Sequence, residues 1–294
     1  MTVGIFDGVH RGHKKILRHL IKSAARMKAE SCVVTFHPHP SRVLYPRRTT
    51  PMLVSTQHKL RLLAGEGVDR IVLVKFTGDF AGIGHARFVE EVLVKRMNVK
   101  RLYVGRNFLF GKGRKGNPAA LRRLGRRFGF SVEVVPPLKS GGKVISSTLI
   151  RRLITSGRLK EAERMLGRSV SILGTVTSGK KRGRILGFPT ANLDLHHEAI
   201  PPSGVYIVKA KLLGRVYDGI MNIGFRPTFA CDGLDSEPTA EVHIFGFKDD
   251  IYGEDLEIGF LKRLRAERRF AHRSSLRRRI AGDVKKAKEY FKKL

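Results

Sequence analysis

The stretch Gly4–His13, with the sequence GIFDGVHRGH, reads as the end of a strand, a turn marked by glycines, and the start of a helix. The apolar residues that follow have the spacing of one helical face: Ile16, Leu17, Leu20, Ile21, Ala24 and Ala25. Gly8 and Gly12 carry no Cβ, so the backbone of the turn can approach a ligand closely. The stretch therefore predicts a strand–turn–helix unit with a binding site at the mouth of the helix.

Two histidines stand at this helix mouth. His10 and His13 are three positions apart, so both side chains can face one bound group. A helix N-terminus offers unpaired N–H groups and a partial positive charge, which suit a phosphate. We therefore expect a nucleotide's phosphates to lie between two imidazoles. The plainer alternative is a glycine turn that carries two surface histidines.

The first half of the chain alternates strand and helix patterns. The strand-like runs are Ser31–Phe36, Arg70–Phe76, Arg101–Val104 and Ser131–Val135, and the helical patterns are His13–Lys28, Thr56–Ala64, His85–Met97 and Pro118–Phe128. Such alternation predicts a doubly wound α/β domain, with a parallel sheet and helices on both faces. Ligands of such sheets lie beyond the carboxyl ends of the strands, where Gly4–His13 falls.

After Gly167 the helical periodicity disappears and short β-rich runs follow. They are Val170–Val176, Tyr206–Leu213, Val216–Ile223, Ala240–Phe247 and Leu256–Phe260. Many short strands separated by turn residues predict a small β-barrel. A closing helix is expected from about Ser275, with Ser274 as its cap. We therefore expect two domains, residues 1–166 and 167–294.

Composition narrows the class of protein. The chain has 294 residues, of which 41% are apolar, enough for two buried cores. It contains no apolar run of about 18 residues, so no membrane association is expected. It opens without the features of a signal peptide, which predicts a cytoplasmic protein. Its two cysteines, Cys32 and Cys231, form no C-x-x-C pair, so neither a structural zinc site nor a disulfide framework is expected.

The charge is strongly positive, with 58 Lys and Arg against 25 Asp and Glu, a formal +33. Such a balance favours anionic partners, namely polyphosphates, nucleic acid or acidic surfaces. The charges are scattered through every predicted element, and no basic motif with interleaved aromatic residues appears. We therefore expect only non-specific nucleic-acid binding.

The pattern of residues 4–13 resembles the start of the bacterial bifunctional riboflavin kinase/FAD synthetase family, part of the nucleotidyltransferase superfamily. The resemblance implies that residues 1–166 form a Rossmann-like FMN adenylyltransferase domain. It casts His10 and His13 as catalytic contacts to phosphate, and it assigns nucleotide binding to Gly4, Phe6, Asp7 and Gly12.

Three more segments match this family. Thr35–Pro40 places two histidines that could ligate a metal, but no third ligand is evident; the resemblance makes the segment part of the nucleotide pocket, and a rigid surface turn is the alternative. Gly105–Gly116 is a basic loop in which Asn107 stands where the family has Asp, and Leu109 where it has Arg. Ile145–Arg151 opens a helix whose hydroxyls and N–H groups suit phosphate oxygens, although an ordinary helix cap is the alternative.

The resemblance assigns nucleotide binding to Asn107, Ser146, Ser147 and Thr148, and a catalytic role to Arg151. The implied reaction is in-line attack of the FMN phosphate on the α-phosphate of ATP, with release of pyrophosphate. No protein nucleophile is needed, because positioning and charge stabilisation, aided by Mg²⁺, are sufficient.

The segment Arg182–Leu193 resembles the Gly-x-Pro-Thr-Ala-Asn motif of riboflavin kinases. The resemblance assigns nucleotide binding to Arg184, Gly187, Pro189 and Thr190. Thr190 and Asn192 offer oxygens suited to Mg²⁺. A Gly/Pro turn between strands is the alternative.

Further blocks match the riboflavin kinases in order up to residue 270. Glu241 lies in a strand-like run, and the resemblance casts it as the base that accepts the proton of the ribityl 5′-hydroxyl. The attacked group is then the γ-phosphate of ATP. Arg263, Arg265 and Phe270 are expected near the flavin. The alternative for Glu241 is an exposed strand glutamate.

The sequence thus predicts a bifunctional enzyme that converts riboflavin to FMN and FMN to FAD, with ATP as co-substrate and Mg²⁺ as cofactor. One alternative is a riboflavin kinase whose synthetase is weakened by Asn107 and Leu109. The other is a basic nucleic-acid-binding protein built on this fold. The sequence leaves the oligomeric state open.

Overall fold

The computed structural model describes residues 1–47, 50–178, 187–196, 198–227, 236–247, 249–268, 270 and 272–294. The chain forms two compact units. The first comprises Met1–Ile150 with Arg164–Gly167, and the second comprises Arg151–Glu163 with Arg168–Leu294.

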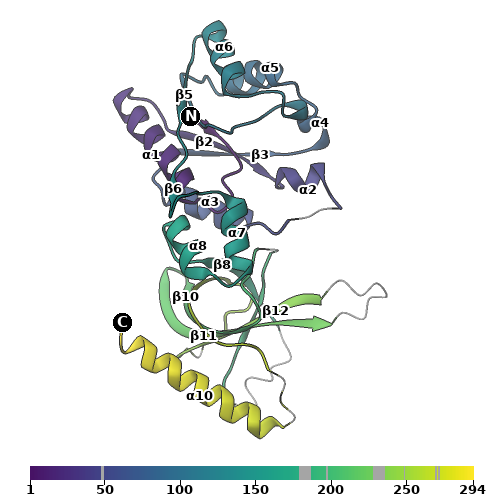
Figure 1. Ribbon diagram of the computed structural model, residues 1–294, viewed down its shortest axis with the longest axis vertical. Helices are drawn as coiled ribbons and strands as arrows, with labels where there is room; N and C mark the ends of the chain where they lie inside the picture. The colour runs from purple at the N-terminus through teal and green to yellow at the C-terminus, as the bar shows by residue number, and fades with distance from the viewer. Residues whose placement is uncertain are drawn as a thin grey trace. The chain divides into compact units, whose positions relative to one another are not determined.

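The first unit is built from alternating strands and helices (Figure 1). In chain order they are β1 (Thr2–Val3), α1 (Arg11–Arg26), β2 (Cys32–His37), α2 (Pro40–Leu44), α3 (Thr56–Ala64), β3 (Arg70–Lys75), α4 (Gly78–Ala81), α5 (His85–Arg87), the π-helix η1 (Phe88–Arg96), β4 (Arg101–Gly105), the 3₁₀ turn η2 (Lys112–Arg114), α6 (Pro118–Phe128), β5 (Ser131–Val135), β6 (Lys139–Ser140) and β7 (Lys143–Val144). They are followed by α7 (Ser147–Thr155) and α8 (Leu159–Leu166).

Five strands form one parallel sheet in the order β3-β2-β1-β4-β5. The chain order reverses between β1 and β4, which creates the crevice where ligands of open α/β sheets bind. The turn after β1 and the loop after β4 both lie at this point.

Helices cover both faces of the sheet (Figure 1). On one face, Val34 and Leu102 belong to a buried cluster with Leu93 of η1 and Leu121 of α6. On the other face, their sequence neighbours Val33 and Tyr103 pack with Leu17 and Leu20 of α1 and Leu63 of α3. Neighbouring strand residues thus enter opposite cores, which confirms the doubly wound fold predicted from the sequence.

The second unit contains a closed barrel of antiparallel strand pairs in the order β10-β11-β12-β9-β8-β13. Its elements are β8 (Ser171–Thr177), β9 (Ala191–Asp194), β10 (Gly204–Leu212), β11 (Arg215–Pro227), β12 (Ser236–Ile244), β13 (Asp255–Arg265) and α10 (Arg273–Phe291). The predicted barrel and terminal helix are both confirmed.

Helix α10 packs on the outside of this barrel. Val205 and Ile207 of β10 and Ile220 of β11 form a cluster with Ala287 of α10. The helix starts at Arg273, and its N-cap residue is His272, whose side chain makes no capping hydrogen bond. The predicted cap at Ser274 is therefore wrong, because this serine lies inside the first turn.

Candidate active sites

The turn after β1 is held in an unusual backbone conformation. Phe6 and Val9 have φ values of 53° and 38°, and Gly8 has 82°. A Cβ at Gly8 would lie 2.6 Å from Cδ1 of Leu53, so only glycine fits here. The Asp7 carboxylate accepts a hydrogen bond from the Leu53 N–H at 2.8 Å. The turn is thereby fixed against the segment that precedes α3.

His10 and His13 lie together at the N-terminus of α1, as predicted. The His10 side chain caps the helix by accepting a hydrogen bond from the His13 N–H at 3.3 Å. The two rings are stacked with centroids 3.6 Å apart, and Phe6 meets His13 edge-on at 5.1 Å. A Cβ at Gly12 would lie 3.1 Å from the His10 ring, so Gly12 admits this stack.

The stacked pair contains a buried polar atom that a ligand could satisfy. Burial, reinforced by the neighbouring His10, holds the pKa of His13 well below its usual range. The His13 Nδ1 atom is buried and has no hydrogen-bond partner among the described residues. A phosphate oxygen would supply both a partner and the negative charge that favours the protonated imidazole.

The start of α7 is joined to the β1 turn. The Ser147 hydroxyl donates to the Asp7 carbonyl at 2.9 Å, over a sequence separation of 140 residues. Ser146 caps the helix by accepting from the Leu149 N–H at 3.3 Å, and Thr148 is exposed. The structure thus brings two predicted motifs to one place. Arg151 lies one turn further along α7, in the second compact unit.

The loop after β4 carries the two departures from the family pattern. Asn107 and Leu109 are exposed in this loop, at the carboxyl end of the strand next to β1. Phe110 anchors the loop by pairing with Gly116 and packing against Phe88, 5.7 Å between ring centroids. Asn107 therefore lies at the predicted edge of the sheet.

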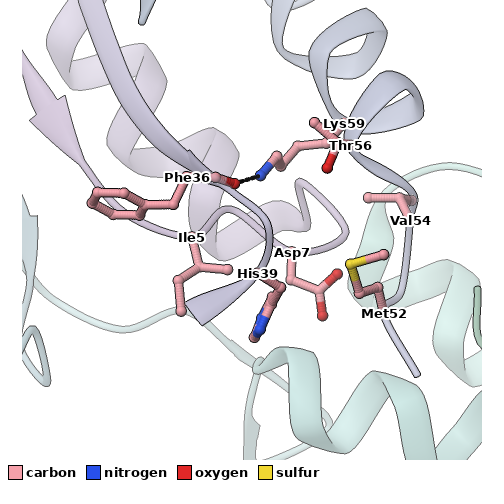
Figure 2. A pocket seen from close by; sticks show the side chains of 8 residues that line it. All are labelled: Ile5, Asp7, Phe36, His39, Met52, Val54, Thr56 and Lys59. Carbon is pink, nitrogen blue, oxygen red and sulfur yellow. Dashed lines mark hydrogen bonds between the residues drawn. The ribbon is translucent and has the colours of Figure 1, made fainter. Parts of the chain in front are cut away.

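A pocket opens between the carboxyl ends of β1 and β2 and the start of α3 (Figure 2). Eight residues line it: Ile5, Asp7, Phe36, His39, Met52, Val54, Thr56 and Lys59. His39 accepts from the Ser41 N–H at 3.1 Å and so caps α2. Phe36 and His39 of the segment Thr35–Pro40 thus line a pocket, and the expectation that it is the nucleotide pocket stays a prediction. Among the described residues, no group of three His, Cys, Asp or Glu side chains could hold a metal ion.

Lys59 is a feature of this pocket that sequence reasoning missed. Its side chain is 6% exposed, and its ammonium donates to the Phe36 carbonyl at 3.0 Å. One signal could have revealed it, namely a lysine on the side of α3 that also carries the fully buried Leu63.

In the barrel, strand register assembles the second site. Glu241 of β12 stands directly opposite Asn192 of β9 on one side and Asn222 of β11 on the other. Directly paired residues in antiparallel strands share a face, so the three side chains form one polar row. Val205 of β10 is paired with Asn222 and belongs to the same row, and it packs against α10 on the outside of the barrel. Glu241 therefore points outward, whereas its buried neighbour Val242 points into the barrel.

The segment before β9 is fastened to β12. His243, two residues after Glu241 on the same face, forms a 2.7 Å hydrogen bond with the Pro189 carbonyl and meets the Phe188 ring edge-on at 5.8 Å. Thr190 directly precedes β9 and stands two positions before Asn192, so both lie near the row of Glu241, Asn192 and Asn222. Gly187 has a left-handed φ of 84°. Arg184 lies outside the described residues.

The expected flavin contacts occupy the end of β13. The Arg265 guanidinium lies 6.0 Å from the centre of the Phe270 ring and forms a 2.8 Å ion pair with Asp283 of α10. Arg263 donates to the Ser203 carbonyl at 2.6 Å. Arg265 thus also links the barrel to its helix.

The oxygen-rich group of Thr190, Asn192 and Glu241 fits a hard divalent cation such as Mg²⁺ in its chemistry, because such ions prefer oxygen ligands and retain water and substrate phosphates in their shell.

Two family models match the chain: FAD synthetase over residues 1–149 and riboflavin kinase over residues 166–291. The chain belongs to the bifunctional riboflavin kinase/FMN adenylyltransferase family. It is 38% identical to the family member of Pseudomonas fluorescens, over 98% of this chain and 91% of that one. It is 37% identical to the member of Escherichia coli K12, over 99% and 92%.

A solved structure from Streptococcus pneumoniae, described as a macrolide-efflux protein, has the same fold as the present chain. The TM-score is 0.83 at 33% identity, over 98% of this chain and 93% of that one. In the part of this chain that the structure describes, no helix is long and apolar enough to cross a membrane.

Proposed function

We propose that this chain phosphorylates riboflavin to FMN in the barrel and transfers an adenylyl group from ATP to FMN in the first domain. The observation that carries the proposal is that motifs far apart in sequence meet in each domain. The β1 turn meets the start of α7, and Glu241 stands beside Asn192. We place the division between the two domains at residues 166 and 167.

In adenylyl transfer, the FMN phosphate oxygen attacks the α-phosphorus of ATP, and the bond to the β-phosphate oxygen breaks to release pyrophosphate. His10 and His13 contact the phosphates, and the buried Nδ1 of His13 finds its hydrogen-bond partner there. The N-terminus of α1 adds its partial positive charge. Gly4, Phe6, Asp7 and Gly12 shape this turn, while Asn107, Ser146, Ser147, Thr148 and Arg151 bind the nucleotide.

In the kinase reaction, Glu241 accepts the proton of the ribityl 5′-hydroxyl as its oxygen attacks the γ-phosphorus of ATP and ADP leaves. Gly187, Pro189 and Thr190, together with Arg184, hold the nucleotide. Thr190 and Asn192 would hold Mg²⁺, which supplies charge stabilisation to the transferred phosphoryl group. Arg263, Arg265 and Phe270 contact the flavin. We place both reactions in the cytoplasm.

A chromatographic product assay with riboflavin, ATP and Mg²⁺ tests the proposal. FMN followed by FAD is the expected result. FMN that accumulates without FAD would mean that Asn107 and Leu109 have weakened the synthetase, and a double Asn107→Asp, Leu109→Arg variant would then restore FAD formation. Absence of both products with reduced and oxidised riboflavin would overturn the proposal.

A further inference from the structure

Lys59 is a buried cation at the edge of the adenylyl-transfer site. Its side chain, 6% exposed, runs from α3 toward the carboxyl end of β2, as Figure 2 shows. The ammonium lines the same pocket as Asp7, which belongs to the turn between β1 and the two stacked histidines. A lysine on a surface helix usually extends into solvent, so this orientation needs a physical reason.

The contacts of Lys59 leave part of its ammonium without an acceptor. An ammonium group carries three N–H donors. Among the described residues, Lys59 makes one side-chain hydrogen bond, 3.0 Å to the Phe36 carbonyl. Burial lowers the pKa of Lys59 to about 8, while the negative charge of Asp7 acts in the opposite direction. The folded protein therefore holds a desolvated cation that its own residues only partly compensate.

The other residues of the pocket do not complete this compensation. The negative charge of Asp7, whose Oδ1 accepts from the Leu53 N–H at 2.8 Å, offsets the effect of burial on Lys59 only in part. The Thr56 hydroxyl is engaged by His37 Nδ1, also at 2.8 Å. A bound anion would satisfy the remaining donors of Lys59, and a phosphate is the anion that the neighbouring histidines suit.

We propose that Lys59 is a phosphate-binding residue of the adenylyl-transfer site, where its ammonium contacts a phosphate group of a substrate. The inference rests on the proposed function and adds to it a residue that no sequence motif marks. Two substrates could supply the phosphate, ATP and FMN, and binding experiments with each one separate them.

The first experiment compares Lys59→Met with the wild type. Methionine keeps the length and apolar stem of the side chain but removes the charge. Calorimetric titrations with pyrophosphate, ATP and FMN are expected to show about 10- to 100-fold weaker binding of at least one of them. The affected ligand identifies the source of the phosphate. At the same time the melting temperature without ligand should rise, because an uncompensated buried cation is removed.

Lys14→Met is the matched control, because Lys14 belongs to the same domain and pairs with Glu66 at 2.6 Å on its surface. This variant also removes one positive charge from a protein of formal charge +33. It therefore measures how much a lower overall charge alone weakens the binding of anions. If Lys59→Met binds all three ligands as tightly as Lys14→Met does, the inference is wrong. It is also wrong if Lys59→Met only lowers the melting temperature.

The pH dependence distinguishes a phosphate contact from a structural role. The ratio of wild-type to Lys59→Met affinity for pyrophosphate should shrink as the pH rises through about 8. The other titratable groups facing Lys59 are Asp7 and His39, with His37 behind Thr56. Both proteins carry these groups, so the ratio isolates the effect of the charge of Lys59. A constant ratio would contradict the inference.

FAD formation separates this inference from the proposed function. If neither the wild type nor the double Asn107→Asp, Leu109→Arg variant makes FAD from FMN and ATP, the adenylyl-transfer part of the proposed function fails. If the wild type and Lys59→Met both make FAD with the same KM and kcat, only the role of Lys59 fails. FMN formation in the barrel should be the same in both proteins.

Discussion

At the scale of single residues, Glu241 depends on its neighbours for its chemistry. An isolated strand glutamate is an ordinary surface residue, but the register places this one between Asn192 and Asn222 on one face of the barrel. In the proposed kinase reaction, Glu241 stands beside Asn192, a proposed metal ligand, and would receive the proton of the attacking hydroxyl.

We predict that Glu241→Gln lowers kcat for FMN formation by about 10²–10⁴, because the amide cannot accept the proton. Conversion of added FMN to FAD by the same protein should be unchanged. Chromatography of both reactions measures this. Glu257→Gln, in strand β13, is the matched control and should retain kinase activity. Full kinase activity of Glu241→Gln would show that Glu241 is an ordinary strand glutamate and does not act as the base.

The lowered pKa of His13 predicts how the stability of the fold depends on pH. Its pKa in the folded protein lies well below 6.5, mainly because of burial. The unfolded chain therefore binds a proton at a higher pH than the folded chain does. Consequently the free energy of unfolding should fall as the pH falls below about 6.5.

Urea denaturation between pH 7.5 and 5 measures this loss. His13→Gln should show less of it than the wild type, whereas His19→Gln, which alters an exposed residue of the same helix, should match the wild type. Equal pH slopes in all three proteins would show that His13 takes up its proton as readily in the folded state as in the unfolded one.

The site residues differ in how far the sequence could predict them. The helical spacing of His10 and His13 predicted that they share a face, and the structure places them in contact. Their stacking could not be predicted, because spacing alone does not show how the rings of an N-cap residue and a first-turn residue are oriented. Lys59 carries no motif, and its role depends on burial, which is a property of the folded chain.

At the scale of elements, β12 positions the segment before β9. The hydrogen bond from His243 to the Pro189 carbonyl fixes the residues that lead into Thr190. His243→Phe would keep a ring against Phe188 but lose the hydrogen bond. We predict about a 5- to 10-fold higher KM for ATP in the kinase reaction, with unchanged adenylyl transfer. Steady-state kinetics at varied ATP check this, and an unaltered KM would show that the segment holds its place without the hydrogen bond.

Helix α10 depends on a buried ion pair. Asp283 is 4% exposed and Arg265 is 15% exposed, with their atoms 2.8 Å apart. We predict that Asp283→Asn destabilises the barrel by about 3 kcal/mol, because it leaves a buried guanidinium without its counter-charge.

Thermal or chemical denaturation measures the effect. Asp218→Asn breaks the exposed pair with Lys209 and is the matched control, with an expected cost of less than about 1 kcal/mol. Equal costs in the two variants would mean that Asp283 makes no special contribution to the docking of α10.

Most elements could be predicted because their apolar periodicity coincides with their burial. Thr56–Ala64 and Pro118–Phe128 were predicted with the observed bounds. Periodicity could not reveal that His85–Met97 continues as a π-helix, since this depends on hydrogen-bond offsets. The cap at Ser274 was mispredicted because helix α10 begins at Arg273, three residues before Leu276, the first residue of its apolar face.

At the scale of the whole molecule, the charge of +33 is the property that the two sites do not account for. We predict sequence-independent binding of oligonucleotides that weakens by about 10³–10⁵ between 50 and 200 mM salt, if six to ten phosphates are contacted. Fluorescence polarisation with oligonucleotides of different sequence measures this. Tight, sequence-selective binding at the higher salt concentration would favour the nucleic-acid-binding alternative.

Two folds in one chain could be predicted because each leaves a different pattern, alternating strand and helix first and short strands afterwards. The point of division is harder to predict. In the structure, helix α7 contributes to both compact units, so no linker marks the change. A continuous helix has no compositional boundary that sequence could reveal.

The two folds differ in how they treat their strand edges. The closed barrel has none, whereas the parallel sheet ends at β3 and β5. Open edges invite pairing between molecules, and charged side chains oppose it. Arg70 and Lys75 are the first and last residues of β3, and Glu133 is the middle residue of β5. Repulsion between copies of so basic a chain adds to this protection. Because salt screens that repulsion, the colloidal stability of the protein depends on ionic strength, and the sheet edges of its first domain are where self-association would begin.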